Sequence, residues 1–170
     1  MLEGVIQIVC PHCDQDNRIP CELLRQAPPC VACGGVLFQG RPAPIEDERR
    51  FDKHVRHSDI PVLALFHAAW SGDSNAVQAV FEQAGPRLEP YARLVSVDGA
   101  ALPDFIERLK VVRYPTLLLL HHERELARVS GAMNLAQLLS WAGPLIAGVA
   151  GRSPLPSPMG HHRPGSPRRG

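Results

Sequence analysis

Short apolar runs alternate with amphipathic segments along the middle of the chain. Four runs have the length and apolar content of strands, at 61–66, 92–98, 116–121 and 125–130. Around them, apolar residues recur at helical spacing over 46–57, 74–85, 102–111 and 134–142. We expect the second of these helices to stop at Gly85 and Pro86, which disfavour its continuation. The predicted order is helix, strand, helix, strand, helix, strand, strand, helix.

This order predicts an α/β fold. Strand–helix–strand units imply parallel pairing through right-handed crossovers. The last two strands are separated by a short charged turn, which implies an antiparallel hairpin. The expected structure over 41–150 is a small mixed sheet with helices on both faces. The proline-rich segment 41–46 is predicted to be a hinge in front of it.

All five cysteines lie near the start of the chain, four of them as two C-x-x-C pairs sixteen residues apart. The pairs are Cys10 with Cys13 and Cys30 with Cys33. Two thiolates three positions apart can bind one ion from a tight turn, and Gly34 and Gly35 can supply the positive φ that such a turn needs. We therefore predict a zinc ribbon over 1–40 with a closed, structural zinc ion. The fifth cysteine, Cys21, is expected to be an incidental loop thiol.

Composition and charge limit the number of domains, the kinds of partner and the cellular location that we expect. The 170 residues allow one ordinary domain and a small module, and the net charge of +1 gives no general attraction to nucleic acid or membrane. The chain has no apolar run long enough for a membrane span and no signal-peptide pattern, so we expect a cytoplasmic protein. Residues 151–170 are rich in Pro and Gly, with four Arg and no acid, and are predicted to form a disordered basic tail.

Several motifs carry a family resemblance. They are the two cysteine pairs, the strand at 61–66, Ala68–Trp70 before a turn, Val95–Asp98, Tyr114–Thr116 and Gly131–Met133. Over about 10–146 the chain resembles the branch of bacterial thioredoxins that carries an N-terminal zinc ribbon. The resemblance implies a thioredoxin-like mixed sheet flanked by helices and preceded by that ribbon.

The resemblance also shows a departure at the site of the family's chemistry. That family catalyses dithiol–disulfide exchange at a W-C-G-P-C turn. At this position the chain has Trp70, Ser71, Gly72, Asp73 and Ser74. A serine hydroxyl cannot form the mixed disulfide. The family's buried carboxylate and its Lys partner align here with Leu65 and Ser96. We therefore expect no catalytic residue at this turn, whose serines suit the start of a helix.

The recognition surface, by contrast, is expected to remain. Tyr114 and Pro115 match the family's cis-proline loop, which offers backbone groups to an extended peptide. The resemblance thus implies a peptide groove formed by Trp70, Ser71, Tyr114, Pro115 and Ala132. We expect a redox-inactive adaptor that binds a protein or peptide segment.

Three alternatives stay open at this point. Trp70 and Pro115 could serve only to keep the fold packed. The N-terminal cysteines could support a thiol–disulfide oxidoreductase or a redox-regulated chaperone. A ribbon that binds nucleic acid with the help of the Arg-rich tail is the least favoured, because four Arg without aromatic residues are a weak signal.

Overall fold

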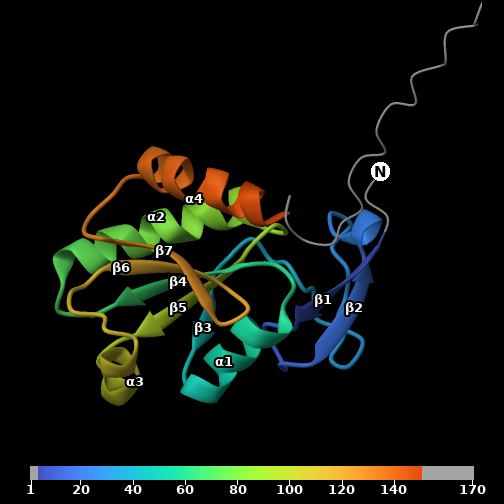
Figure 1. The fold of residues 1–170 in the computed structure, drawn as a ribbon, viewed down its shortest axis with the longest axis horizontal. Helices are drawn as coiled ribbons and strands as arrows, with labels where there is room; N and C mark the ends of the chain where they lie inside the picture. The colour runs from blue at the N-terminus through green and yellow to red at the C-terminus, as the bar shows by residue number, and fades with distance from the viewer. Residues whose placement is uncertain (1–3, 151–170) are drawn as a thin grey trace, which may run out of the picture.

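The computed structural model describes residues 4–150, which are built around one five-stranded sheet (Figure 1). The strands lie in the order β3–β5–β4–β6–β7. Their bounds are Ala43–Ile45 (β3), Val62–His67 (β4), Arg93–Asp98 (β5), Thr116–His121 (β6) and Arg124–Ser130 (β7). Strands β3 and β4 run parallel to β5, whereas β6 is antiparallel to β4 and β7 is antiparallel to β6. The predicted mixed sheet is confirmed.

Helices cover both faces of this sheet (Figure 1), as the sequence pattern predicts. Helices α1 and α3 pack on one face, and α2 and α4 pack on the other. Their bounds are Glu48–His57 (α1), Gly72–Leu88 (α2), Pro103–Arg108 (α3) and Leu135–Ala150 (α4). Compared with the prediction, α3 ends earlier, at Arg108, and α4 continues past Pro144.

The central strand β4 explains the continuous apolar run in the sequence. Successive side chains of a strand point to opposite faces. Val62, Ala64 and Phe66 accordingly join the core beneath α1 and α3, while Leu63 and Leu65 join the core beneath α2 and α4. A strand that is buried on both faces is expected to have a nearly continuous apolar sequence.

The direction of β6 departs from the expected strand–helix–strand rule. A parallel crossover must return across the whole length of the sheet, but α3 has only six residues, about 9 Å of helix. The connection from β5 therefore comes back at the same end of the sheet, and β6 starts there and runs antiparallel to β4. The sequence pattern, which predicts a helix over 102–111, does not reveal how short α3 is.

The segment 41–46 is not a hinge, which corrects the prediction. Its residues Ala43–Ile45 form the edge strand β3 and pair with Val95–Val97 of β5. Because the segment contains two prolines, its sequence pattern does not predict a strand. Pro44 is compatible with it because an edge strand leaves one side without hydrogen-bonding partners in the sheet.

Helix α2 does not stop at Gly85 and Pro86 but continues to Leu88. Gly85 is buried, and a Cβ atom there would overlap the backbone carbonyl of Gly40. The glycine is therefore needed for the close approach of two backbones, and its helix-breaking tendency is overridden. Sequence reading alone cannot distinguish these two uses of a glycine.

The N-terminal lobe, residues 4–40, has a small sheet of its own (Figure 1). Strands β1 (Val5–Val9) and β2 (Asp16–Pro20) pair antiparallel and are followed by the short helix η1 (Cys21–Leu23). Its core contains Ile8, Ile19 and Leu37, and Ile60 from outside the lobe packs against them. The predicted disordered tail, 151–170, lies outside the described residues. Within residues 4–150 no helix is long and apolar enough to cross a membrane.

One buried ion pair joins the N-terminal lobe to the sheet. Arg93, the first residue of β5, and Glu89 are 1% and 3% exposed, and Nη1 and Oε1 lie 2.9 Å apart. Arg93 Nη2 donates to the carbonyl of Leu37 over 2.6 Å, and the guanidinium lies 4.8 Å from the centre of the Phe38 ring. The Glu89 carboxylate accepts from the amide of Gly40 over 2.8 Å. The end of the lobe is thus held by a charge pair from the sheet domain.

Replacing Arg93 by Met should lower the free energy of unfolding by about 3–5 kcal/mol, because the Glu89 carboxylate would stay buried without its partner. The double variant R93M/E89Q should lose less than R93M, since it leaves no charge behind. Denaturant titration measures both. Arg56→Met is the control, because its ion pair with Glu123 is exposed and such pairs contribute under about 1 kcal/mol. Equal losses in R93M and R56M would contradict this role.

Candidate functional site

The four paired cysteines meet at one point. Their Sγ atoms all lie within 4.8 Å of one another, with Cys10 and Cys33 3.7 Å apart and Cys13 and Cys30 3.6 Å apart. A disulfide would need about 2.05 Å. Metal–sulfur bonds of about 2.3 Å in a tetrahedron place sulfur atoms about 3.8 Å apart. These cysteines could therefore hold a metal ion, and their spacing fits four-sulfur tetrahedral binding.

Each cysteine pair lies on a tight turn that the local sequence explains. The residue after the second cysteine is left-handed in both turns, with φ of 61° at Asp14 and 72° at Gly34. Amides inside the turns point at sulfur: His12 donates to Cys10 Sγ over 3.3 Å, and Gly35 donates to Cys33 Sγ over 3.4 Å. Gly35 does not take the expected positive φ. It is needed instead because a Cβ atom there would lie 2.7 Å from the His12 ring.

The environment of Cys30 favours a thiolate. Burial opposes its ionisation, but hydrogen bonds from the amides of Cys33 and Ala32 and from the Asn17 side chain lower its pKa to about 6. Asn17 is itself buried, and its Oδ1 accepts from the amide of Val31 over 2.8 Å. Nothing in the sequence pointed to Asn17, because a lone Asn in a strand has no motif.

The fifth cysteine, Cys21, lies apart from this group. It is buried in the core of the N-terminal lobe, and burial raises the pKa of its thiol. Reactive cysteines are partly exposed and have a lowered pKa. Cys21 has neither property and behaves as a small apolar residue.

The first cysteine turn is anchored to α1. Asp14 Oδ1 lies 2.8 Å from Arg50 Nε and 3.3 Å from His54 Nε2. Arg50 also donates to the carbonyls of Pro11 and Pro44. His54 is fully buried, and burial together with the nearby charge of Arg93 lowers its pKa to about 4 despite Asp14. This histidine is therefore neutral at physiological pH.

The turn after β4 forms the start of α2. Ser71 is the N-cap of that helix, and its Oγ accepts from the amide of Ser74 over 3.2 Å. Ser74 is fully buried, and its Oγ accepts from the amide of Ala68 over 3.3 Å. Among the described residues no hydrogen bond connects either serine to a histidine. Both hydroxyls thus serve the backbone, as expected for a capped helix.

An aromatic pair lies beside this turn. The rings of Trp70 and Tyr114 meet edge to face, with centroids 5.8 Å apart and planes at 90°. Trp70 is 71% exposed, and the peptide bond between Tyr114 and Pro115 is cis. The carbonyl of Pro115 accepts from the amide of Gly131 over 2.9 Å, which brings the loop containing the exposed Ala132 alongside. The structure thus gathers the five predicted groove residues, including Ser71, at one end of the sheet.

One further residue, Gly99, shapes this aromatic pair, and an exposed apolar residue, Val112, precedes it in the chain; neither was predicted from the sequence. A Cβ atom at Gly99 would overlap the ring of Tyr114, so only a glycine leaves space for that side chain. Val112, two residues before Tyr114, is 89% exposed. The sequence offers a signal only for Val112, as an apolar residue next to a proline loop. The need for Gly99 depends on where β5 ends relative to β6.

Leu65 and Ser96 face each other across neighbouring strands. They are register partners in β4 and β5 and line a cavity of about 370 Å³ beneath α2, together with Gln78 and Phe81. Neither residue titrates. The lining also includes Arg41 and the carboxylate of Glu82, so the carboxylate in this cavity comes from α2 and not from the two strands.

Comparison with known proteins agrees with this architecture. The thioredoxin family model matches residues 43–143. Thioredoxin C-3 of Corynebacterium nephridii is 33% identical over 134 residues, which cover 79% of this chain and 91% of that protein. Thioredoxin of Mycobacterium tuberculosis is 30% identical over 89 residues, 52% of this chain and 77% of that protein. The chain belongs to the thioredoxin family.

Solved structures show the same fold at lower identity. Thioredoxin from Trypanosoma brucei brucei superposes with a TM-score of 0.58 at 20% identity, covering 64% of this chain and 93% of that one. Chloroplastic thioredoxin z superposes with a TM-score of 0.57 at 20% identity, covering 64% and 96%. At this identity the likeness concerns the fold alone.

The buried His54 predicts a pH dependence of stability. Below its ordinary pKa near 6.5, His54 of the unfolded chain takes up a proton that the folded chain does not accept until about pH 4. The free energy of unfolding should therefore fall by roughly 3 kcal/mol through this window. His54→Leu should remove that part of the slope, whereas His57→Leu, at an exposed position, should keep it. Parallel curves for the native chain and H54L in denaturant titrations would contradict the prediction.

Proposed function

We propose that this protein is a redox-inactive member of its family that binds an extended peptide in the groove around Trp70, Ser71, Tyr114, Pro115 and Ala132. The observation that carries the proposal is the exposed aromatic pair beside a cis-proline, next to a turn that contains no sulfur. An exposed Trp contributes apolar area at low entropic cost in a binding surface. An extended peptide would pair through backbone hydrogen bonds with the loop that precedes the cis-proline.

The polar groups of the turn support an inactive site. Exchange requires a thiolate, and the hydroxyls of Ser71 and Ser74 are both engaged with backbone amides. Leu65 and Ser96 supply no proton carrier at their own positions in the sheet, and the carboxylate that lines the same cavity, Glu82, belongs to α2. Burying Leu65 instead of a carboxyl also removes a desolvation cost of several kcal/mol. Once the reaction is absent, this part of the core is free to become apolar.

The rival proposal, an oxidoreductase or redox-regulated chaperone that uses the N-terminal cysteines, is less well supported. The N-terminal lobe contacts Arg93 at the first residue of β5, whereas Ser71 follows the last residue of β4, which runs parallel to β5. The cysteines and the groove therefore lie at opposite ends of the sheet (Figure 1). A thiol at one end cannot attack a disulfide that is bound at the other.

For the four cysteines we propose a structural zinc ion. Zinc prefers four thiolates in a tetrahedron, and such a set leaves no coordination position for a substrate. Cys10, Cys13, Cys30 and Cys33 would hold the ion and compensate for the small core of the lobe. Thiolate ligands persist in a reducing compartment, so we also propose a cytoplasmic location.

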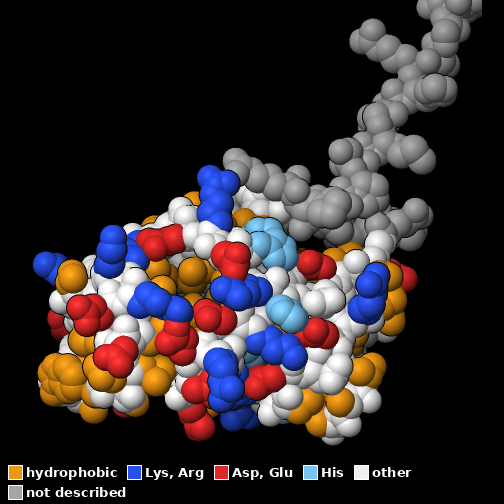
Figure 2. All heavy atoms as spheres, turned by 60° about the horizontal axis from the view of Figure 1, so that its bottom comes forward, with side chains coloured by type: hydrophobic (Ala, Val, Ile, Leu, Met, Phe, Trp, Pro, Cys, Tyr) orange, Lys and Arg blue, Asp and Glu red, His pale blue; other side chains and the backbone are white. Residues whose placement is uncertain are grey.

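Within residues 4–150, the face that carries α1 and α3 gives no support for a nucleic-acid partner. Acidic and basic side chains are interspersed on the face that carries α1 and α3 (Figure 2), where Arg108 pairs with Glu48 and Asp52. Nucleic-acid binding needs a stripe of unpaired positive charge. A protein or peptide segment is therefore the partner that we propose.

The zinc proposal predicts a local loss of structure on chelation. The purified chain should contain one zinc per molecule, and a chelator under reducing conditions should remove amide-exchange protection in β1 and β2 while β4 and β6 keep theirs. Cys13→Ser should lower zinc affinity at least about tenfold, because it removes one ligand. Cys21→Ser is the matched control and should keep the metal. Unchanged protection in β1 and β2 after complete removal of zinc would contradict a structural role.

The groove proposal predicts which substitutions weaken binding. Linear peptides selected from a displayed random library against the native chain should bind Trp70→Ala and Tyr114→Ala at least about tenfold more weakly, a loss of about 1.4 kcal/mol. Gly99→Ala should have a similar effect, because the new methyl group displaces the Tyr114 ring without removing it.

Two matched controls accompany this experiment. Gly148→Ala adds the same methyl group in open space on α4, and Tyr91→Ala removes the other tyrosine of the chain. Both should keep peptide affinity. Peptides that bind W70A and G99A as tightly as the native chain would refute the groove, and measurable disulfide reduction by the zinc-loaded native chain would refute redox inactivity.

A further inference from the structure

A trough follows the junction between the N-terminal lobe and the sheet domain. It consists of two neighbouring cavities of about 410 and 350 Å³ that share Arg87 and Tyr91. The larger cavity is closed on the lobe side by Leu24, Arg25 and Phe38. The smaller, more apolar cavity is bounded by Gly143, Ile146 and Ala147 of α4. We call these two cavities together the junction trough.

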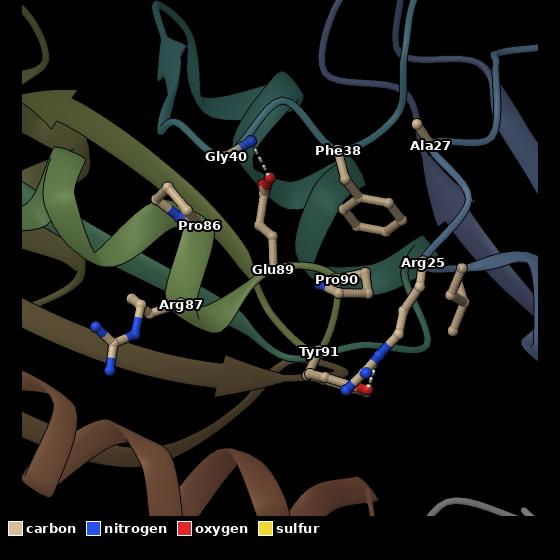
Figure 3. Close-up of a pocket in the computed structure, with 10 residues that line it drawn as sticks. Arg25, Ala27, Phe38, Gly40, Pro86, Arg87, Glu89, Pro90 and Tyr91 are labelled. Atoms are coloured by element: carbon tan, nitrogen blue, oxygen red, sulfur yellow. Dashed lines mark hydrogen bonds between the residues drawn. The ribbon is translucent and has the colours of Figure 1, made fainter.

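The lining of the junction trough is aromatic and rich in proline (Figure 3). The Phe38 ring lies near Pro90, with Pro86 on the opposite side of Glu89. Arg25 from the lobe donates through Nε to the hydroxyl of Tyr91 over 2.7 Å. Surfaces of this composition, an aromatic ring next to further flat apolar groups, bind proline-rich segments in the polyproline II conformation.

The charged groups in the lining of the trough are Glu89, Arg25 and Arg87. Its one carboxylate, Glu89, is already satisfied by Arg93 and by the amide of Gly40. Arg25 donates to the neutral hydroxyl of Tyr91 and keeps its positive charge, and the side chain of Arg87 points away from the Phe38 and Pro90 side of the cavity (Figure 3). The smaller cavity is lined mainly by Leu88, Gly143, Ile146 and Ala147, so an uncharged apolar segment fits there.

The chain contains such a segment close to this place. Helix α4 is described up to Ala150, only one turn beyond Ile146 and Ala147 in the wall of the smaller cavity. The sequence continues as Gly-Arg-Ser-Pro-Leu-Pro-Ser-Pro-Met over 151–159, with three prolines, a Leu and a Met and no acid. Proline-rich segments populate polyproline II before they bind, so ordering them costs little entropy.

We propose that residues 154–159 of the same chain dock in the junction trough. The attachment at Ala150 gives the segment an effective concentration in the millimolar range, so even a weak contact would be populated. Leu155 and Met159 supply the apolar side chains for the cavity beside α4 and for the face of Tyr91. The docked segment would bridge the lobe and the sheet domain, at the opposite end of the molecule from the Trp70 groove.

Limited trypsin digestion of the full chain tests this proposal. Trypsin cuts after Arg152, next to the proposed segment, and after Arg168, which lies nine residues beyond its end and reports the unprotected rate. Tyr91→Ala should raise the rate of cleavage after Arg152, relative to that after Arg168, by about fivefold or more, because cleavage follows the population of the open form. Mass spectrometry measures both cleavages in one sample.

Two further variants keep the test falsifiable. Leu155→Ser should have the same effect as Y91A without altering any of residues 4–150, and Tyr114→Ala, at the other end of the sheet, should have none. Relative rates that are equal in the native chain, Y91A and L155S would overturn the proposal. Protection at Arg152 that disappears on tenfold dilution would also overturn it, because the segment would then come from a second copy of the chain.

Discussion

The arrangement of the whole molecule depends on one buried charge pair. Arg93 and Glu89 connect the start of β5 and the end of α2 to the carbonyl of Leu37 and the amide of Gly40. A guanidinium suits this position because it is planar and has five donors, so it can serve several acceptors at once. The pair is buried at high desolvation cost, which its mutual attraction and its hydrogen bonds to Leu37 and Gly40 offset, although Arg93 Nε is buried without a partner among the described residues. It therefore determines where the N-terminal lobe can lie.

With the lobe anchored in this way, the cysteine cluster and the aromatic pair lie at opposite ends of the sheet. Four thiols gather in the lobe at the end of the sheet where β5 begins, and the aromatic pair of Trp70 and Tyr114 lies at the end where β4 stops. Beside that pair the serine hydroxyls bond to backbone amides and the Trp70 ring is exposed, which is the basis of the peptide-binding function that we propose. In the lobe, sulfur atoms point at one another and at amides, which favours metal binding over exchange with a partner.

Two glycines determine the packing at the two ends of the sheet, through contacts with residues that are distant in sequence. Gly85 lets the backbone of α2 approach Gly40 at the lobe, and Gly99 gives Tyr114 its place at the groove. Neither glycine has a positive φ, so backbone conformation does not explain them. In both cases the absence of a side chain allows another group to occupy that volume. A larger side chain at Gly85 or Gly99 will therefore displace the group that it meets, the backbone at Gly40 or the Tyr114 ring.

The sequence alone determined the helices, the central strands and the two cysteine turns, because hydrophobic period and C-x-x-C spacing are local signals. The strand at Ala43–Ile45, the antiparallel direction of β6 and the ion pair of Arg93 with Glu89 were decided by tertiary structure. An edge strand with prolines has no local pattern, and β6 turns back only because α3 is too short to cross the sheet. The residues of the proposed groove were predicted from the sequence, but the place of the Tyr114 ring depends on Gly99, whose role exists only where β5 and the Tyr114 loop meet.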